Sequence, residues 1–116
     1  IEVCNRDYKT GLSALTMAQD QLLIAFIAPP WGDALNKSTG LDLRRTTPPI
    51  TEIVDLLIGI AGKNPLLCAI QVYETLDPVS LAELTPHFSW SEKRMYGLNA
   101  PGQNHGIFMG SRGWVP

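Results

Sequence analysis

The chain of 116 residues has little cysteine, few histidines and no long apolar run. Its two cysteines, Cys4 and Cys68, are too few for a disulfide framework. Both lie in apolar stretches, which favours reduced, buried thiols and a cytoplasmic location. The longest apolar runs, such as residues 22–30, fall far short of the roughly 20 residues that span a bilayer, so we expect no membrane-spanning helix. Histidine and cysteine also show no metal-ligand spacing, so we expect no metal site.

Neither positive nor negative charge predominates in the sequence. Nine Lys and Arg against eleven Asp and Glu give a net charge of −2, which excludes a strongly basic nucleic-acid binder. With 45% apolar residues, the composition is that of an ordinary globular protein. The length predicts a single domain over residues 1–116. Because the chain starts at Ile1 with neither Met nor a basic leader, we expect that domain to be incomplete at its N-terminus.

Apolar runs, separated by proline and glycine, predict alternating strands and helices. Residues 22–27 and Leu66–Tyr73 are continuous apolar runs, typical of strands buried on both faces. Between them, apolar residues recur every three or four positions over Ile50–Ala61, which predicts a helix with one buried face. A strand, a crossover helix and a second strand predict parallel pairing.

Weaker patterns predict the elements on either side of this unit. They are a strand at residues 1–4, a helix at 10–18, a short helix that starts at Pro78 after an Asp77 cap and ends by Pro86, and an antiparallel hairpin of strands at 92–98 and 105–110. The predicted fold class is therefore α/β, with parallel strands that end in an antiparallel hairpin.

The segment formed by Ala28, Pro29, Pro30 and Trp31 directly follows the first apolar strand. Ligands of open parallel sheets bind beyond the carboxyl ends of the strands, where this segment lies. Proline donates no N–H, so the carbonyl oxygens here are predicted to accept hydrogen bonds from an amino group while Trp31 stacks on a flat ring. In the alternative interpretation the segment only ends the strand and Trp31 covers the core.

These four residues resemble the [Asp/Asn/Ser]-Pro-Pro-[Tyr/Trp/Phe] motif of class I S-adenosylmethionine-dependent methyltransferases that modify exocyclic amines. Residues 1–8, 26–33 and 41–44 are similar to the trimethylguanosine synthase family, which methylates the N2 amine of guanine in RNA caps. The similarity spans nearly the whole chain but only the C-terminal half of that family's catalytic domain. The implied fold is therefore the C-terminal half of a Rossmann-like methyltransferase sheet.

The resemblance also implies a cofactor, a substrate class and site residues. The cofactor is S-adenosylmethionine, with Asp7 and Tyr8 at its adenine and Ala28 as a further cofactor contact. The partner is a purine-containing substrate, in RNA or in a nucleotide. The catalytic set is Ala28, Pro29, Pro30 and Trp31, which would hold the amine and its ring. Alternatively, Asp7 only caps a helix that starts near Lys9.

The sequence departs from the family pattern in two places. Ala28 stands where the motif has a side-chain acceptor, so only backbone carbonyls are available to the amine there. No Gly-x-Gly-x-x-Gly loop occurs in the chain, and the loop that holds the methionine end of the cofactor is expected before Ile1. Two alternative functions therefore stay open: methyl transfer to a small molecule or protein, and a non-catalytic half-domain that serves as a binding module.

Three further expectations concern charges, histidines and the sheet edge. The charged connector around Asp33, Arg44 and Arg45 is predicted to be a loop, either a substrate lid with an arginine for an anion or simply solvated charge. Of the two histidines, His105 is expected to open a strand, and neither is assigned to catalysis. The strand at residues 22–27 lacks a neighbour on one side, so self-association through that edge is expected.

Overall fold

The computed structural model describes residues 3–97 and 100–116. A four-stranded sheet forms its centre, in the order β1-β4-β6-β5, and a two-stranded sheet pairs β2 with β3. The strands are β1 (Leu23–Ile27), β2 (Leu35–Asn36), β3 (Gly40–Leu41), β4 (Leu66–Tyr73), β5 (Trp90–Tyr96) and β6 (His105–Arg112). The helices are α1 (Tyr8–Ser13), α2 (Ile50–Ala61) and α3 (Pro78–Leu84), with short 3-10 turns at Gly32–Ala34 and Thr85–His87.

The predicted strand–helix–strand unit is confirmed. β1 and β4 pair in parallel from Leu23 opposite Leu66 to Ile27 opposite Ile70, with α2 between them in the chain. β5 and β6 form the predicted antiparallel hairpin, and β6 also pairs antiparallel with β4. The fold is thus mixed α/β, as expected from the alternating pattern.

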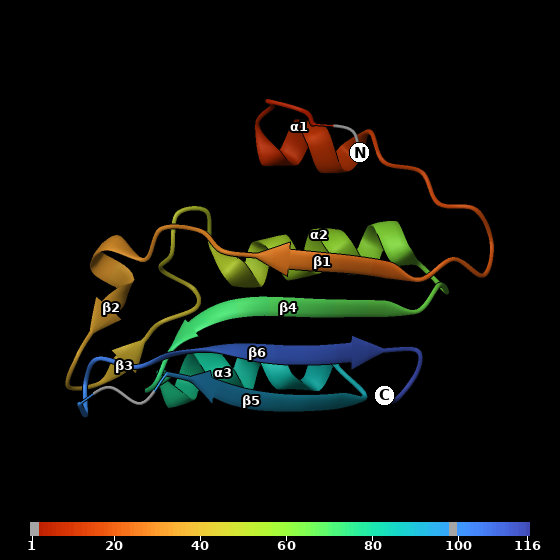
Figure 1. The fold of residues 1–116 in the computed structure, drawn as a ribbon. Coiled ribbons are helices and arrows are strands. Elements are labelled where there is room, and N and C mark those ends of the chain that lie inside the picture. The colour runs from red at the N-terminus through yellow and green to blue at the C-terminus, as the bar shows by residue number, and fades with distance from the viewer. Residues whose placement is uncertain (1–2, 98–99) are drawn as a thin grey trace.

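One face of the sheet carries the core. In Figure 1, α2 and α3 lie behind the strands. Alternate residues of β4 are buried in the core. Apolar residues of α2, among them Ile50, Val54 and Leu57, complete this layer. The periodic apolar stripe of the helix therefore has the partner that its spacing predicts.

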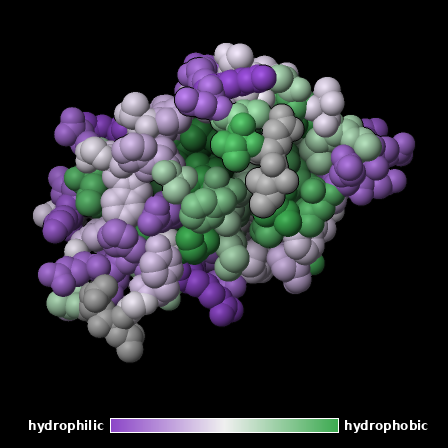
Figure 2. Space-filling view, turned by 45° about the horizontal axis from the view of Figure 1, so that its top comes forward, coloured by the Kyte–Doolittle hydropathy of each residue, from purple (hydrophilic) through white to green (hydrophobic). Residues whose placement is uncertain are grey.

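The other face of the sheet differs from the prediction. Strand β1 was expected to be buried on both sides, but Ile24 and Phe26 are 63% and 68% exposed. The cause is that no helix within the described residues covers this face of the sheet, which is turned toward the viewer in Figure 1. Figure 2 shows hydrophobic side chains gathered around β1 and the N-terminal segment.

Element boundaries show further corrections. The predicted helix at residues 10–18 is shorter and begins earlier, at Tyr8, because Asp7 caps it. Of the predicted strand at residues 1–4, Val3 and Cys4 are not in a strand, and the first two residues lie outside the described part. The hairpin strands span Trp90–Tyr96 and His105–Arg112 rather than residues 92–98 and 105–110, and residue 98 also lies outside the described part.

The open edge of β1 leads to the first testable prediction. Within the described residues β1 pairs only with β4, and its exposed Ile24 adjoins that unpaired edge. Because an apolar strand edge offers free backbone groups to another chain, we expect the protein to self-associate as its concentration rises. Ile24→Lys should reduce this association in light scattering. Val79→Lys, at an exposed position on α3, is the matched control and should leave it unchanged. A monodisperse monomer at all concentrations would contradict the prediction.

Candidate functional site

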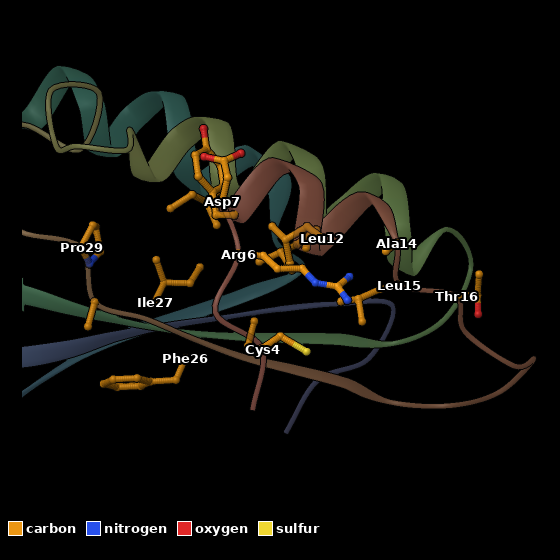
Figure 3. Close-up of a pocket in the computed structure, with 16 residues that line it drawn as sticks. Cys4, Arg6, Asp7, Leu12, Ala14, Leu15, Thr16, Phe26, Ile27 and Pro29 are labelled. Atoms are coloured by element: carbon orange, nitrogen blue, oxygen red, sulfur yellow. The ribbon is translucent and has the colours of Figure 1, made fainter. Parts of the chain in front are cut away.

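A cavity of about 690 Å³ lies between α1, the segment before it, the end of β1, and α2. Figure 3 shows side chains from these segments turned toward it, with Asp7 and Arg6 on the α1 side and Ile27 and Pro29 on the β1 side. Its wall is formed by Cys4, Arg6, Asp7, Tyr8, Gly11, Leu12, Ala14, Leu15, Thr16, Ala25, Phe26, Ile27, Ala28, Pro29, Ile53 and Leu57. Most of these residues are apolar, and the volume is in the range typical of small-molecule sites.

The cavity brings together the three residues that were predicted to contact the cofactor. Asp7 and Tyr8 come from the start of α1, and Ala28 follows the last residue of β1. Twenty positions of chain separate Tyr8 from Ala28, yet both line the same cavity. Pro29, from the predicted catalytic set, lines the same cavity.

Asp7 has a structural role that the sequence interpretation left open. One of its carboxylate oxygens accepts a hydrogen bond from the backbone N–H of Lys9 at 3.1 Å, so Asp7 is the N-cap of α1. Its other oxygen has no hydrogen-bond partner in the part of the chain that the structure describes. Capping therefore leaves the second oxygen of this carboxylate available to accept another hydrogen bond.

Helix α1 is held over the cavity mainly by contacts with α2. None of its residues is buried, and the Lys9 ammonium lies 2.7 Å from the Glu52 carboxylate of α2. The hydrogen bond with Lys9 lowers the pKa of Glu52, and Glu52 in turn raises the pKa of Lys9. Burial of its ring, together with Glu52, raises the pKa of Tyr8. Tyr8 and Leu12 of α1 also pack against the core, so this wall is held by apolar contacts together with an exposed ion pair that salt screens.

The carbonyl groups after β1 differ in their partners. The Pro30 carbonyl accepts a hydrogen bond from the Thr47 N–H at 3.5 Å, and the Trp31 carbonyl accepts one from the Ala34 N–H at 2.9 Å. Within the described residues, no hydrogen bond is recorded to the carbonyls of Ala28 and Pro29. These two oxygens are therefore the acceptors that the segment offers to a ligand, and Pro30 contributes to the turn.

Trp31 does not line the cavity but belongs to an aromatic cluster beside it. Its indole packs edge-on against Tyr73, with ring centroids 6.1 Å apart, and at a tilt against His105, with centroids 4.9 Å apart. The ring is partly buried and packs on the core. Trp31 thus covers part of the core, as the alternative interpretation held, and its ring stays partly exposed at the end of the sheet.

The connector after Trp31 is not the open lid that was considered. Leu41 and Leu43 are buried, and the backbone of Leu41 is hydrogen-bonded to Thr75 and Asp77 at 2.9 Å each. The Arg44 guanidinium lies 3.0 Å from Asp42, 3.6 Å from Asp77 and 3.5 Å from Glu83.

These contacts determine whether the charged side chains of the connector are available to bind a ligand. The hydrogen bond from the Arg44 guanidinium holds the pKa of Asp42 below its usual value. With three carboxylates around it, Arg44 is occupied and unsuited to a phosphate. Neither Asp33, in the 3-10 turn after Trp31, nor the exposed Arg45 lines the cavity.

Sequence reasoning missed several residues of the site. Cys4, Leu12, Ile53 and Leu57 line the cavity although none was proposed as a contact. The periodic spacing placed Ile53 and Leu57 on the buried face of their helix, but the packing of α1 against that face was not visible in the pattern. His105 lies beside Trp31 because it is in register with Tyr73 across β4 and β6. The expected hairpin placed His105 at a strand start, which is confirmed, but strand order was needed to bring it to Trp31.

The two cysteines differ in exposure, and this gives the second testable prediction. Cys68 is buried, as expected, whereas Cys4 is exposed, so the prediction of two buried thiols is wrong for Cys4. Burial raises the pKa of the Cys68 thiol to about 12. Because the thiolate is the reactive form, iodoacetamide at pH 8 should alkylate Cys4 and leave Cys68 unmodified in the folded protein. Peptide mass spectrometry measures both, and modification of Cys68 at the rate of Cys4 would contradict the burial.

No group of metal-binding side chains occurs in residues 3–97 and 100–116. In the same residues, no helix has the length and apolar character needed to cross a membrane. Comparison with family profiles, curated proteins and solved structures found no match to this chain. The cavity and the aromatic cluster therefore carry the functional argument.

Proposed function

We propose that this chain is a methyltransferase-like domain that binds S-adenosylmethionine and transfers its methyl group to an exocyclic amine of a purine, in RNA or in a nucleotide. The observation that carries the proposal is the meeting of Asp7, Tyr8, Ala28 and Pro29 at one cavity, with Trp31 two residues further on. The resemblance assigned cofactor and substrate contacts to these positions from motifs alone. Parallel strands followed by an antiparallel hairpin are also what the resemblance implies for the fold.

The cavity suits the adenosine part of the cofactor. Its apolar walls, including Leu12, Ile53 and Leu57, match a flat purine ring. The Asp7 oxygen that does not cap α1 can accept a hydrogen bond from an amino group, and a charged acceptor makes that bond stronger than a neutral one. Tyr8 adds an aromatic surface at the same wall. The carboxylate acceptor, the aromatic ring and the apolar walls therefore suit the adenosine part of the cofactor.

The proposed reaction requires no acid, base or nucleophile from the protein side chains. When bound, the sulfonium of the cofactor supplies an activated methyl group, and the protein has to position the amine and exclude water. The carbonyls of Ala28 and Pro29 accept hydrogen bonds from the amine hydrogens and so direct its lone pair. Trp31 fixes the plane of the acceptor ring. No side chain needs to become covalently modified.

The proposal is tested by protection of Cys4, which lines the cavity and is exposed. S-adenosylhomocysteine and adenosine should both slow alkylation of Cys4 by iodoacetamide, because each places a purine in the cavity. Methionine alone should not, and Cys68 is the internal control for unfolding. Since the chain has no Gly-x-Gly-x-x-Gly loop, we expect weak binding and use the nucleosides in large excess. Unchanged alkylation of Cys4 with both nucleosides would refute the adenine site.

Methyl transfer to a small molecule is the second candidate function. Two observations favour it: the net charge is −2, and Arg44 is held by three carboxylates instead of being open to a phosphate. Nucleic-acid binding draws on cationic contacts that release counterions, and this chain offers few. Transfer of a tritiated methyl group to RNA, to guanosine monophosphate and to small amines separates the two candidates.

A further inference from the structure

The aromatic cluster at the carboxyl ends of β1 and β4 contains a residue to which neither the motif nor the proposed function gives a role. His105 is exposed at the first position of β6, and its imidazole lies 4.9 Å from the indole of Trp31 at an angle of 58°. Tyr73, directly across from His105 in the sheet, contacts the same indole edge-on. Trp31 is thus contacted by two rings from two neighbouring strands.

The two rings that contact Trp31 differ in how rigidly they are held. Tyr73 is 2% exposed, and its hydroxyl donates a hydrogen bond to the Gly102 carbonyl at 2.7 Å, so this ring is fixed. His105 is the outer of the two contacts, on the solvent side of the cluster. The backbone of Trp31 is held by the 3-10 turn that follows it, whereas the torsions of its side chain are restricted only by the groups that pack against the ring. The outer restriction therefore comes from His105.

We propose that His105 is a positioning residue that fixes the indole plane of Trp31. This inference rests on the proposed function in one respect, namely that the oriented indole receives the acceptor ring. Aromatic stacking needs a defined offset or edge-to-face geometry, so an indole that samples several rotamers binds a flat ring less well. His105 acts through Trp31 and has no part in the transfer of the methyl group.

The experiment uses the complete chain labelled with 5-fluorotryptophan. Its three tryptophans, Trp31, Trp90 and Trp114, give separate ¹⁹F resonances that Trp→Phe variants assign. In His105→Ala, the transverse relaxation of the Trp31 resonance should change, because the indole gains motion, while those of Trp90 and Trp114 stay as they were. His105→Phe keeps a ring at the position and should restore the Trp31 signal. Unchanged relaxation of Trp31 in His105→Ala would overturn the proposal.

A second measurement separates this inference from the proposed function. Guanosine monophosphate is titrated while the Trp31 resonance is observed. We expect the dissociation constant of guanosine monophosphate to rise about two- to tenfold in His105→Ala and to return to the value of the unmodified protein in His105→Phe. The protection of Cys4 by adenosine should be unchanged in both variants. If guanosine monophosphate leaves Trp31 of the unmodified protein unaffected, the purine acceptor is refuted, and relaxation alone decides the role of His105. Equal dissociation constants in the presence of binding would overturn the positioning role.

Discussion

Replacing Trp31 with alanine is expected to weaken binding of a purine acceptor about 5- to 150-fold and to leave cofactor affinity nearly unchanged, since stacking on an aromatic ring contributes roughly 1 to 3 kcal/mol. Trp31 lies outside the wall of the cavity beside α1 and packs instead on Tyr73 and His105. Titration with guanosine monophosphate and with S-adenosylhomocysteine measures the two affinities separately.

Stability must be measured beside affinity because Trp31 also packs on the core. Removal of a fully buried tryptophan costs about 3 to 5 kcal/mol, and this ring is only partly buried, so we expect a smaller loss. Trp90→Ala is the matched control, because Trp90 is a partly buried tryptophan of β5 far from this turn in the sequence. If Trp31→Ala lowers the melting temperature without a specific loss of acceptor binding, Trp31 is a core residue and the stacking role is wrong.

Replacing Asp7 with alanine is expected to weaken S-adenosylhomocysteine binding by about 1 to 3 kcal/mol, through loss of a charge-assisted hydrogen bond to the adenine amino group. The structure adds a second effect, because Asp7 also caps α1. Loss of a cap costs about 1 kcal/mol, and a helix of six residues has little stability of its own. Detachment of α1 would remove one wall of the cavity.

Two variants separate the hydrogen bond from the cap. Asp7→Asn keeps a good N-cap but loses the charge, so it should fall between the unmodified protein and Asp7→Ala in calorimetric titration. Asp77→Ala removes the cap of α3, which contributes nothing to the cavity wall, and should lower stability without changing the affinity. An unchanged affinity in Asp7→Ala would remove Asp7 from the site.

The elements that could be predicted from the sequence are those with strong local patterns. The spacing of apolar residues over Ile50–Ala61 and the run Leu66–Tyr73 matched the observed helix and strand at both ends. Proline and glycine mark those boundaries through backbone preferences that act locally. Residues 10–18 lack such signals, and the helix begins earlier than predicted because the Asp7 side chain caps it.

The site was predictable in part for a similar reason. Asp7, Tyr8, Ala28 and Pro29 stand at the ends of elements, and in α/β folds such positions gather at one edge of the sheet. Trp31 follows the same strand, but its partners come from β4 and β6, whose adjacency depends on strand order. Pairing across strands is a contact between residues far apart in the chain, and single-sequence patterns do not encode it.

By itself, the sequence determined the α/β class, the parallel pair joined by a helix, the final hairpin and the placement of the Ala-Pro-Pro-Trp turn after a strand, because each follows from local periodicity and backbone preference. Only the tertiary structure decided that Asp7 both caps α1 and lines a cavity, that Cys4 is exposed, that Arg44 is paired, and that His105 contacts Trp31. These features depend on which surfaces meet when helices pack and strands align, and those contacts join residues that are far apart in the chain.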